Sequence, residues 1–188
     1  MTIPKFKDTP LEELDLVFFD CEFTGLEILK HELIEIGFVK AKAKTLEFIE
    51  EGDIKILPQH IETADPHSLQ LNGYNEEEWK NEGVGKKEGL EEFLRHTENC
   101  MLIGHNVNAD RMFVQKALEE VGLKPNFHYK SLDTLSLGWA KLKDKGNFKT
   151  FSLLNELAPH FEVDTGREHR AIDDARTTYQ VFKKLIDK

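Results

Sequence analysis

Two acidic residues, Asp20 and Glu22, lie two positions apart in the segment FFDCEFTGL. On a β-strand, side chains at positions i and i+2 lie on the same face, so both carboxylates would converge while Cys21 points the other way. Carboxylates a few ångströms apart repel each other, and a divalent cation removes that repulsion. Magnesium and manganese prefer oxygen ligands of this kind. The spacing therefore indicates a metal site, with the alternative that the two residues only cap the end of a strand.

A third acid, Asp110, stands in the segment GHNVNADRMFV. The expected strand before it ends at His105 and Asn106, so Asp110 falls in the first turn of the following helix. An acid in that turn also favours the helix dipole, which is an alternative to a chemical role. We expect His105 and Asn106 to reach a substrate, although Asn106 could equally fasten the turn between strand and helix.

A histidine and a fourth acid open the last expected helix, in the segment HRAIDD. Residues five apart on one helix point about 140° away from each other, so we place His169 on the loop before the helix and Asp174 within it. Apolar residues follow Asp174 on the same side of the helix, so Asp174 leans toward the packed face and Asp173 is the more exposed neighbour. A carboxylate on the packed face needs partners. A lone histidine is more often a surface residue, so His169 alone would not indicate catalysis.

In this order, the three segments resemble the DEDDh family of 3′-to-5′ exonucleases over nearly the whole chain. DCEFTG is similar to the family's first motif, written D-x-E-x-T-G, GHNVNAD is similar to the second, and HRAIDDARTTYQVF is similar to the third. LIEIGFV and SLDTLSL also look like the family's second strand and the segment after its second motif. Each motif is weak alone, and their order at full-domain spacing makes the resemblance specific.

The resemblance implies an α/β, RNase H-like fold with a five-stranded mixed sheet flanked by helices. It also implies two divalent cations, Mg²⁺ or Mn²⁺, held by four acids that match positions of this chain, Asp20, Glu22, Asp110 and Asp174. His169 matches the family's histidine. The activity implied is a metal-dependent 3′-5′ exonuclease, a phosphodiester hydrolase that releases nucleoside 5′-monophosphates.

On these assignments we expect a two-metal mechanism, with the ions about 4 Å apart. Asp20 bridges both ions, and Glu22 with Asp174 completes the site that holds the attacking water. Asp110 acts on the second ion, directly or through water, and that ion stabilises the leaving 3′ oxygen. His169 is the general base, because an imidazole pKa near 6.5 suits that task.

The resemblance places Phe23 and Thr24 beside the terminal nucleotide, with Leu26 as a wedge. Phe23 stands where the family often has threonine, and Ala109 replaces a frequent phenylalanine before Asp110, so both residues reshape the nucleotide pocket. The Phe23 ring either stacks on a base or packs in the core. Between these alternatives the sequence does not decide.

The elements that position these residues follow an α/β order. The first three strands should form an antiparallel meander, with the third interrupted at Gly52-Asp53, and the later strands should form parallel βα units. We expect strands at Leu16–Asp20, Leu33–Val39, Leu46–Leu57, Cys100–Gly104 and Ser131–Asp133. We expect helices within 75–99 and at Asn108–Gly122, Thr134–Leu142, Ser152–Ala158 and Ala171–Ile186.

Composition limits the classes of protein. A chain of 188 residues with 39% hydrophobic and 32% charged residues fits one domain, 1–188. A net charge of −10 excludes a nucleic-acid binder held by electrostatics over its whole surface. No apolar stretch approaches the roughly 18 residues of a membrane span, and the N-terminus lacks the apolar core of a secretory signal. Two cysteines are too few for a disulfide framework, so we expect a cytoplasmic protein without a membrane partner.

Positive charge gathers in two places. Lys141–Lys149 carries four lysines and one aspartate, and Arg167 and Arg170 flank His169. These groups either contact the phosphates of a strand or, for the lysine cluster, form a solvated loop. The acidic segment 75–99 is interpreted as a solvated face away from the substrate. Asp133 follows a strand and precedes a helix, which favours an N-cap.

Three functions fit the sequence. The leading one is a free-standing 3′-5′ exonuclease on single-stranded DNA or frayed 3′ ends, and the alternative is an exoribonuclease on short or structured RNA, because the ribose 2′-OH pocket is not visible in the sequence. A catalytically inactive binding module would normally have lost one of the four acids or His169. A polymerase partner is required only for proofreading, and the chain's end at Lys188, directly after the last helix, argues for independence. The oligomeric state is not indicated, and the scattered histidines disfavour zinc.

Overall fold

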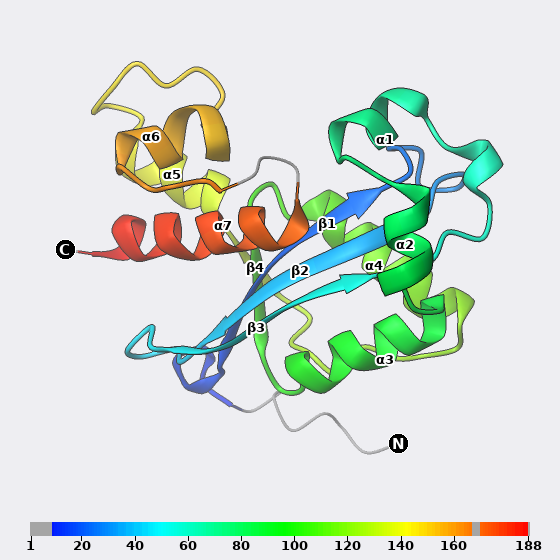
Figure 1. Cartoon of the computed structure of the whole chain (residues 1–188). Helices are drawn as coiled ribbons and strands as arrows, with labels where there is room; N and C mark the ends of the chain where they lie inside the picture. Colours follow the sequence, from blue (N-terminus) through cyan, green and yellow to red (C-terminus); the bar gives the residue numbers. More distant parts are fainter. Residues whose placement is uncertain (1–8, 167–169, 188) are drawn as a thin grey trace.

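The computed structural model describes residues 9–166 and 170–187. A five-stranded mixed sheet in the order β3-β2-β1-β4-β5 lies at the centre, with helices on both faces (Figure 1). The strands are β1 (Leu16–Phe23), β2 (Leu33–Ala41), β3 (Phe48–Lys55), β4 (Met101–Gly104) and β5 (Ser131–Asp133). The α-helices are α1 (Pro66–Leu71), α2 (Glu76–Glu82), α3 (Lys86–Thr97), α4 (Asn108–Glu120), α5 (Thr134–Leu142), α6 (Ala158–His160) and α7 (Ala171–Ile186). The predicted fold class is confirmed.

The sheet has the predicted topology. β1, β2 and β3 pair antiparallel, whereas β4 pairs parallel with both β1 and β5. The expected interruption at Gly52-Asp53 is wrong, because Gly52 and Asp53 pair in register with Phe38 and Gly37 of β2. Gly52 serves a packing purpose instead, since a Cβ there would lie 2.6 Å from Cε1 of the Phe38 ring.

The single helix expected within 75–99 is two helices. α2 ends at Gly83, whose backbone is extended, and Val84 forms an isolated bridge with Ile56 beyond the end of β3. The apolar residues at helical spacing, Leu90, Phe93 and Leu94, all lie in α3. The glycines on both sides of Val84 disfavour a continuous helix across this connection, because glycine has the weakest helix propensity after proline.

The other helices lie close to their predicted bounds, with one change of type. The segment predicted as Ser152–Ala158 forms a π-helical turn at Leu153–Leu157 that continues into the short α6. α1 was not predicted, although Pro66 at its start and the Asp65 side chain, which accepts from His67 N, form a standard helix N-terminus. Within residues 9–166 and 170–187, no helix is long and apolar enough to cross a membrane.

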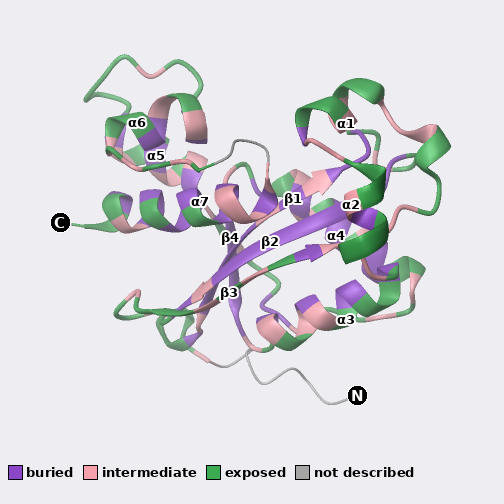
Figure 2. Cartoon of the chain, in the orientation of Figure 1, coloured by how far each residue is buried: buried purple, intermediate pink, exposed green. Residues whose placement is uncertain are grey.

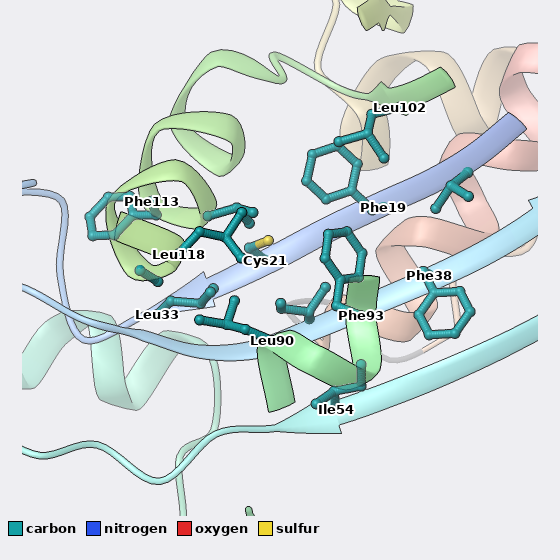
Figure 3. Packing of buried hydrophobic residues seen from close by; sticks show 14 of the residues in the cluster. Phe19, Cys21, Leu33, Phe38, Ile54, Leu90, Phe93, Leu102, Phe113 and Leu118 are labelled. Atoms are coloured by element: carbon teal, nitrogen blue, oxygen red, sulfur yellow. The ribbon is translucent and has the colours of Figure 1, made fainter. Parts of the chain in front are cut away.

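Alternating side chains of β1 build a separate core on each face of the sheet. Phe19 and Cys21 pack against Phe93 of α3 and Leu118 of α4 (Figure 3). Phe18, on the opposite face, packs in a second cluster with Tyr179 and Phe182 of α7. Figure 2 shows the result, with buried strands β1 and β2 between helices whose outer sides are exposed. Burying a large apolar side chain contributes about 1.5–3 kcal/mol, so these two clusters fix which face α7 covers.

The first turn of α7 rests directly on β2 at Gly37. A Cβ on Gly37 would overlap the backbone of Ala171 and Ile172. Only glycine therefore allows this close approach between strand and helix. The approach sets the depth at which the beginning of α7 meets the sheet.

We predict that Gly37→Ala destabilises the protein by about 1–3 kcal/mol, because the added methyl must push α7 away from β2. Urea unfolding followed by circular dichroism measures the change. Gly85→Ala is the control, since a Cβ at Gly85 meets no atom within 4 Å. An equal shift of the unfolding midpoint in both variants would contradict the close-approach explanation.

Candidate active site

β1 is longer than its neighbour β4, and this difference in length opens the site. The parallel pairing of the two strands ends at Phe18 with Ile103, so β1 continues without a partner on that edge. The N-terminus of α4 occupies the vacated edge, where the Cys21 N–H donates to Asp110 Oδ1 at 3.2 Å. A backbone group that the sheet leaves unpaired is thereby satisfied by an acidic side chain.

Three carboxylates converge beside this edge. Asp20 and Glu22 come from the same face of β1, as predicted, and Asp174 comes from the first turn of α7. Each offers one oxygen, and these oxygens lie within 4.8 Å of one another. Asp174 is buried, whereas Asp20 and Glu22 are half-buried and keep a solvent-accessible side. Asp173 is less buried than Asp174, as the helical spacing indicated, and it pairs with Arg176.

Asp110 lies next to this group of three. Its charge is the largest electrostatic cause, after burial, of a raised pKa at Asp20. Its side chain is 6% exposed and is oriented by the Cys21 N–H. Asp110 therefore lies beside Asp20. Among the described residues, the group of oxygens within 4.8 Å of one another comes from Asp20, Glu22 and Asp174 and does not include Asp110.

The metal-free site is electrostatically unfavourable. Burial and the neighbouring acids raise the pKa of Asp20 well above its ordinary value and raise the pKa of Glu22 to about 8. Burial likewise raises the pKa of Asp110 to about 7. Two full charges 4.8 Å apart repel by on the order of 3 kcal/mol at an effective dielectric constant of about 20. Oxygen donors in this number and spacing are the ligands of a hard divalent cation, so the residues present fit such an ion.

Glu35 is an acidic residue of the site region that the sequence prediction missed. It lies on β2 directly opposite Glu22 and is 0% exposed. Arg170, at the start of α7, pairs with its Oε1 at 3.1 Å. A charged residue within the apolar strand segment LIEIGFV was the available signal, because a buried carboxylate requires a partner.

The predicted nucleotide contacts at Phe23 and Thr24 lie in the interior. The Phe23 ring stacks on Phe113 with ring centroids 4.0 Å apart, so the core alternative holds. Thr24 is fully buried, and its Oγ1 accepts from the Glu32 N–H at 2.8 Å. The buried Thr24 side chain therefore has a structural role at the end of β1, and its position beside a terminal nucleotide stays a prediction.

The other predicted substrate contacts are placed differently. Leu26 is 78% exposed on the loop after β1, as a wedge requires. Asn106 is exposed with a positive φ, and its N–H donates to Asp133, which also caps α5 as predicted. His105 Nδ1 lies 2.9 Å from the Thr134 hydroxyl, so this imidazole links the end of β4 to the start of α5. Burial lowers the pKa of His105, which favours the neutral ring.

The basic residues are mostly engaged within the protein. Arg170 pairs with Glu35 and Glu78, so its expected contact with substrate phosphates is wrong. Glu78 belongs to α2, so segment 75–99 is not only a solvated face. Lys141 Nζ donates to the last carbonyls of α7. His169 and Arg167 lie outside the described residues.

A mixed five-stranded sheet with carboxylates gathered on its central strand and last helix defines a nuclease of the DEDD class. The chain belongs to the RNase T-type exonuclease family, whose profile, described as Exonuclease, matches residues 17–182. It is an enzyme family of 3′-5′ exonucleases, and the Asp20–Glu22 acidic cluster is consistent with that active site.

Sequence relatives are polymerases of much greater length. The chain is 33% identical over 176 residues to DNA polymerase III PolC-type of Caldanaerobacter subterraneus. The matched segment covers 94% of this chain and 12% of that protein. The protein of the same name from Thermotoga petrophila is 32% identical over 181 residues, with 96% and 12% covered. The chain therefore spans about an eighth of these relatives.

Solved structures share the fold at low sequence identity. E. coli Exonuclease I in complex with a dT13 oligonucleotide gives a TM-score of 0.78 at 15% identity, with 92% of this chain and 41% of that chain covered. Cell-death related nuclease 4 gives a TM-score of 0.77 at 13% identity, with 92% and 63% covered.

We predict that the stability of the metal-free protein falls as pH rises from about 4.5 to about 8. The pKa of Glu22 is about 8 in the folded chain against an ordinary value of 4.5, so the folded chain holds more protons across this range than the unfolded chain does. The free energy of unfolding should decrease by on the order of 1 kcal/mol per pH unit. Urea unfolding in chelator measures it. Glu22→Gln, which has no proton to lose, should show a flatter dependence, and equal slopes would contradict the assignment.

Proposed function

We propose that this chain is a metal-dependent 3′-5′ exonuclease that releases nucleoside 5′-monophosphates from single-stranded DNA or frayed 3′ ends. The convergence of Asp20, Glu22 and Asp174 within 4.8 Å carries the proposal. Asp174 is more than 150 residues from Asp20 and Glu22 in the sequence, and bringing the three carboxylates together costs electrostatic energy that a bound cation would offset. A binding module without catalytic activity would gain nothing from this electrostatic repulsion among its carboxylates.

Asp20, Glu22 and Asp174 would hold divalent cations, Mg²⁺ or Mn²⁺, with Asp110 beside Asp20. When bound, a pair of such ions activates water and stabilises the charge of the transition state of phosphodiester hydrolysis. The half-buried faces of Asp20 and Glu22 leave room for the scissile phosphate, whereas buried Asp174 and Asp110 fix the site from two helices.

His169 is proposed as the general base on the sequence resemblance. It immediately precedes Arg170, whose side chain is held at the start of α7. The imidazole takes the proton of the attacking water. Leu26, exposed on the loop after β1, is proposed to contact the terminal base, and His105 and Asn106 remain proposed contacts on the α4 side.

DNA is the favoured substrate because the sequence relatives described above are DNA polymerases and one structural neighbour was solved with a DNA oligonucleotide. The same likeness supports a second candidate role, proofreading beside a polymerase. We also propose that residues 1–188 form one exonuclease domain, since the family match from 17 to 182 includes both β1 and α7. Buried free thiols at Cys21 and Cys100 support a cytoplasmic location.

We predict that Asp174→Asn abolishes shortening of 5′-labelled oligonucleotides from their 3′ ends, as chelator does to the unmodified protein. Matched single-stranded DNA and RNA, resolved on a denaturing gel with Mg²⁺, provide the measurement. Asp173→Asn is the control, because Asp173 is adjacent in sequence yet pairs with Arg176 away from the cluster. Retained activity in Asp174→Asn would exclude this site, and preferential shortening of RNA would replace the DNA assignment.

We predict that His169→Ala lowers kcat by about 10²–10⁴-fold, the usual contribution of a general base, without weakening binding of Mn²⁺. Single-turnover hydrolysis gives the rate, and calorimetric titration with Mn²⁺ gives the affinity. A loss of metal affinity with unchanged kcat would assign His169 to the metal site instead.

A further inference from the structure

Arg170 occupies the junction between the loop after α6 and the first turn of α7. Its backbone carbonyl accepts the N–H groups of Asp173 at 2.9 Å and Asp174 at 3.0 Å, so it is the residue from which the helix begins. Asp174 is thus one helical turn away from Arg170, and any movement of Arg170 moves the carboxylate that joins Asp20 and Glu22.

The Arg170 side chain contacts residues of two other elements. Its guanidinium donates to Glu35 of β2 through both Nε and Nη2, and to Glu78 of α2 at 3.1 Å. It also lies 5.8 Å from the ring centroid of buried Trp79, whose own Nε1 donates to the Ile34 carbonyl. One side chain therefore ties the beginning of α7 to β2 and α2.

Burial separates this contact from an ordinary surface ion pair. The side chain of Arg170 is 12% exposed and that of Glu35 is 0% exposed. Removing one partner of a buried pair leaves an uncompensated charge, which is far more disruptive than the loss of an exposed pair. Here the group left without Arg170 would be the buried Glu35 carboxyl, which lies opposite Glu22 in the strand register.

The geometry points to Arg170 as a positioning residue for the metal site, an inference that rests on the proposed function. Held by Glu35 and Glu78, Arg170 fixes α7 laterally, while the close approach at Gly37 fixes its depth. Together the two contacts place Asp174 among the other carboxylates.

Arg176 offers a matched comparison on the same helix. It too pairs with two acids, Glu51 and Asp173, but its side chain is 48% exposed. Exposed pairs contribute about 0–1 kcal/mol, and the partner of Arg176 outside α7 is Glu51 of β3. Removing Arg176 tests the loss of an arginine from α7 with the contacts of Arg170 to β2 and α2 left in place.

The test is calorimetric titration of the full chain with Mn²⁺ in the absence of nucleic acid, for the unmodified protein, Arg170→Gln, Arg170→Lys and Arg176→Gln. We expect Arg170→Gln to weaken Mn²⁺ binding by about 10–100-fold, the usual effect of removing a group that orients a ligand. Arg170→Lys should be intermediate, because an ammonium cannot reproduce the forked contact with Glu35 and Glu78. Arg176→Gln should bind as the unmodified protein does. In nuclease assays, Arg170→Gln should lower kcat and leave KM for the oligonucleotide unchanged.

The outcomes separate the two proposals. If the unmodified protein does not bind Mn²⁺, the proposed function itself is overturned, and the role of Arg170 with it. If the unmodified protein binds Mn²⁺ and folded Arg170→Gln binds it equally well, only the role of Arg170 is overturned. If Arg170→Gln does not fold, Glu78→Gln decides, since it removes one anchor and spares the buried pair with Glu35. Weaker Mn²⁺ binding by folded Glu78→Gln supports the proposal, and unchanged binding overturns it.

Discussion

The mutual repulsion of Asp20, Glu22 and Asp174 is the interaction around which this structure is arranged. Like charges in a partly buried pocket would separate if the backbone allowed it. They are held together because β1 and α7 are fixed by packing on both faces of the sheet, through clusters of aromatic and aliphatic side chains that do not depend on the charges. Hydrophobic burial therefore supplies the free energy that keeps the carboxylates close. A divalent cation bound between them would compensate their repulsion.

Charge is divided between two neighbouring regions. Next to the carboxylate cluster, Arg170 and Lys55 pair with four acids from β2, β3 and α2, so each cation in this region already has protein partners. In the site itself, burial and the neighbouring acids outweigh Arg170 and raise the pKa of Glu22 to about 8. Arg170 thus holds the start of α7, while the carboxylate cluster keeps a negative charge that a divalent cation would compensate. This division explains how an acidic chain with a net charge of −10 can act on a polyanion.

The unequal lengths of the strands explain how residues from opposite faces of the sheet meet. Asp20 faces α7, whereas α4 packs on the other face, and an acid at the start of α4 could not reach Asp20 through a complete sheet. Because the pairing of β1 with β4 ends at Phe18, the N-terminus of α4 passes the free edge and brings Asp110 beside Asp20. The short β4 is therefore as necessary to the site as the acids themselves.

The sequence alone predicted which acids gather beside β1, the topology of the sheet and the family, because period-two and helical patterns and the motifs can be recognised along the chain itself. It also placed Asp174 on the packed side of its helix. Only the tertiary structure decided that Phe23 and Thr24 are interior, that segment 75–99 is broken by a bridge to Ile56, and that Arg170 faces Glu35 rather than substrate. Each of these depends on which distant residue occupies the space next to a side chain. That neighbour is fixed by how the helices pack on the sheet. The spacing of residues along the chain does not predict it.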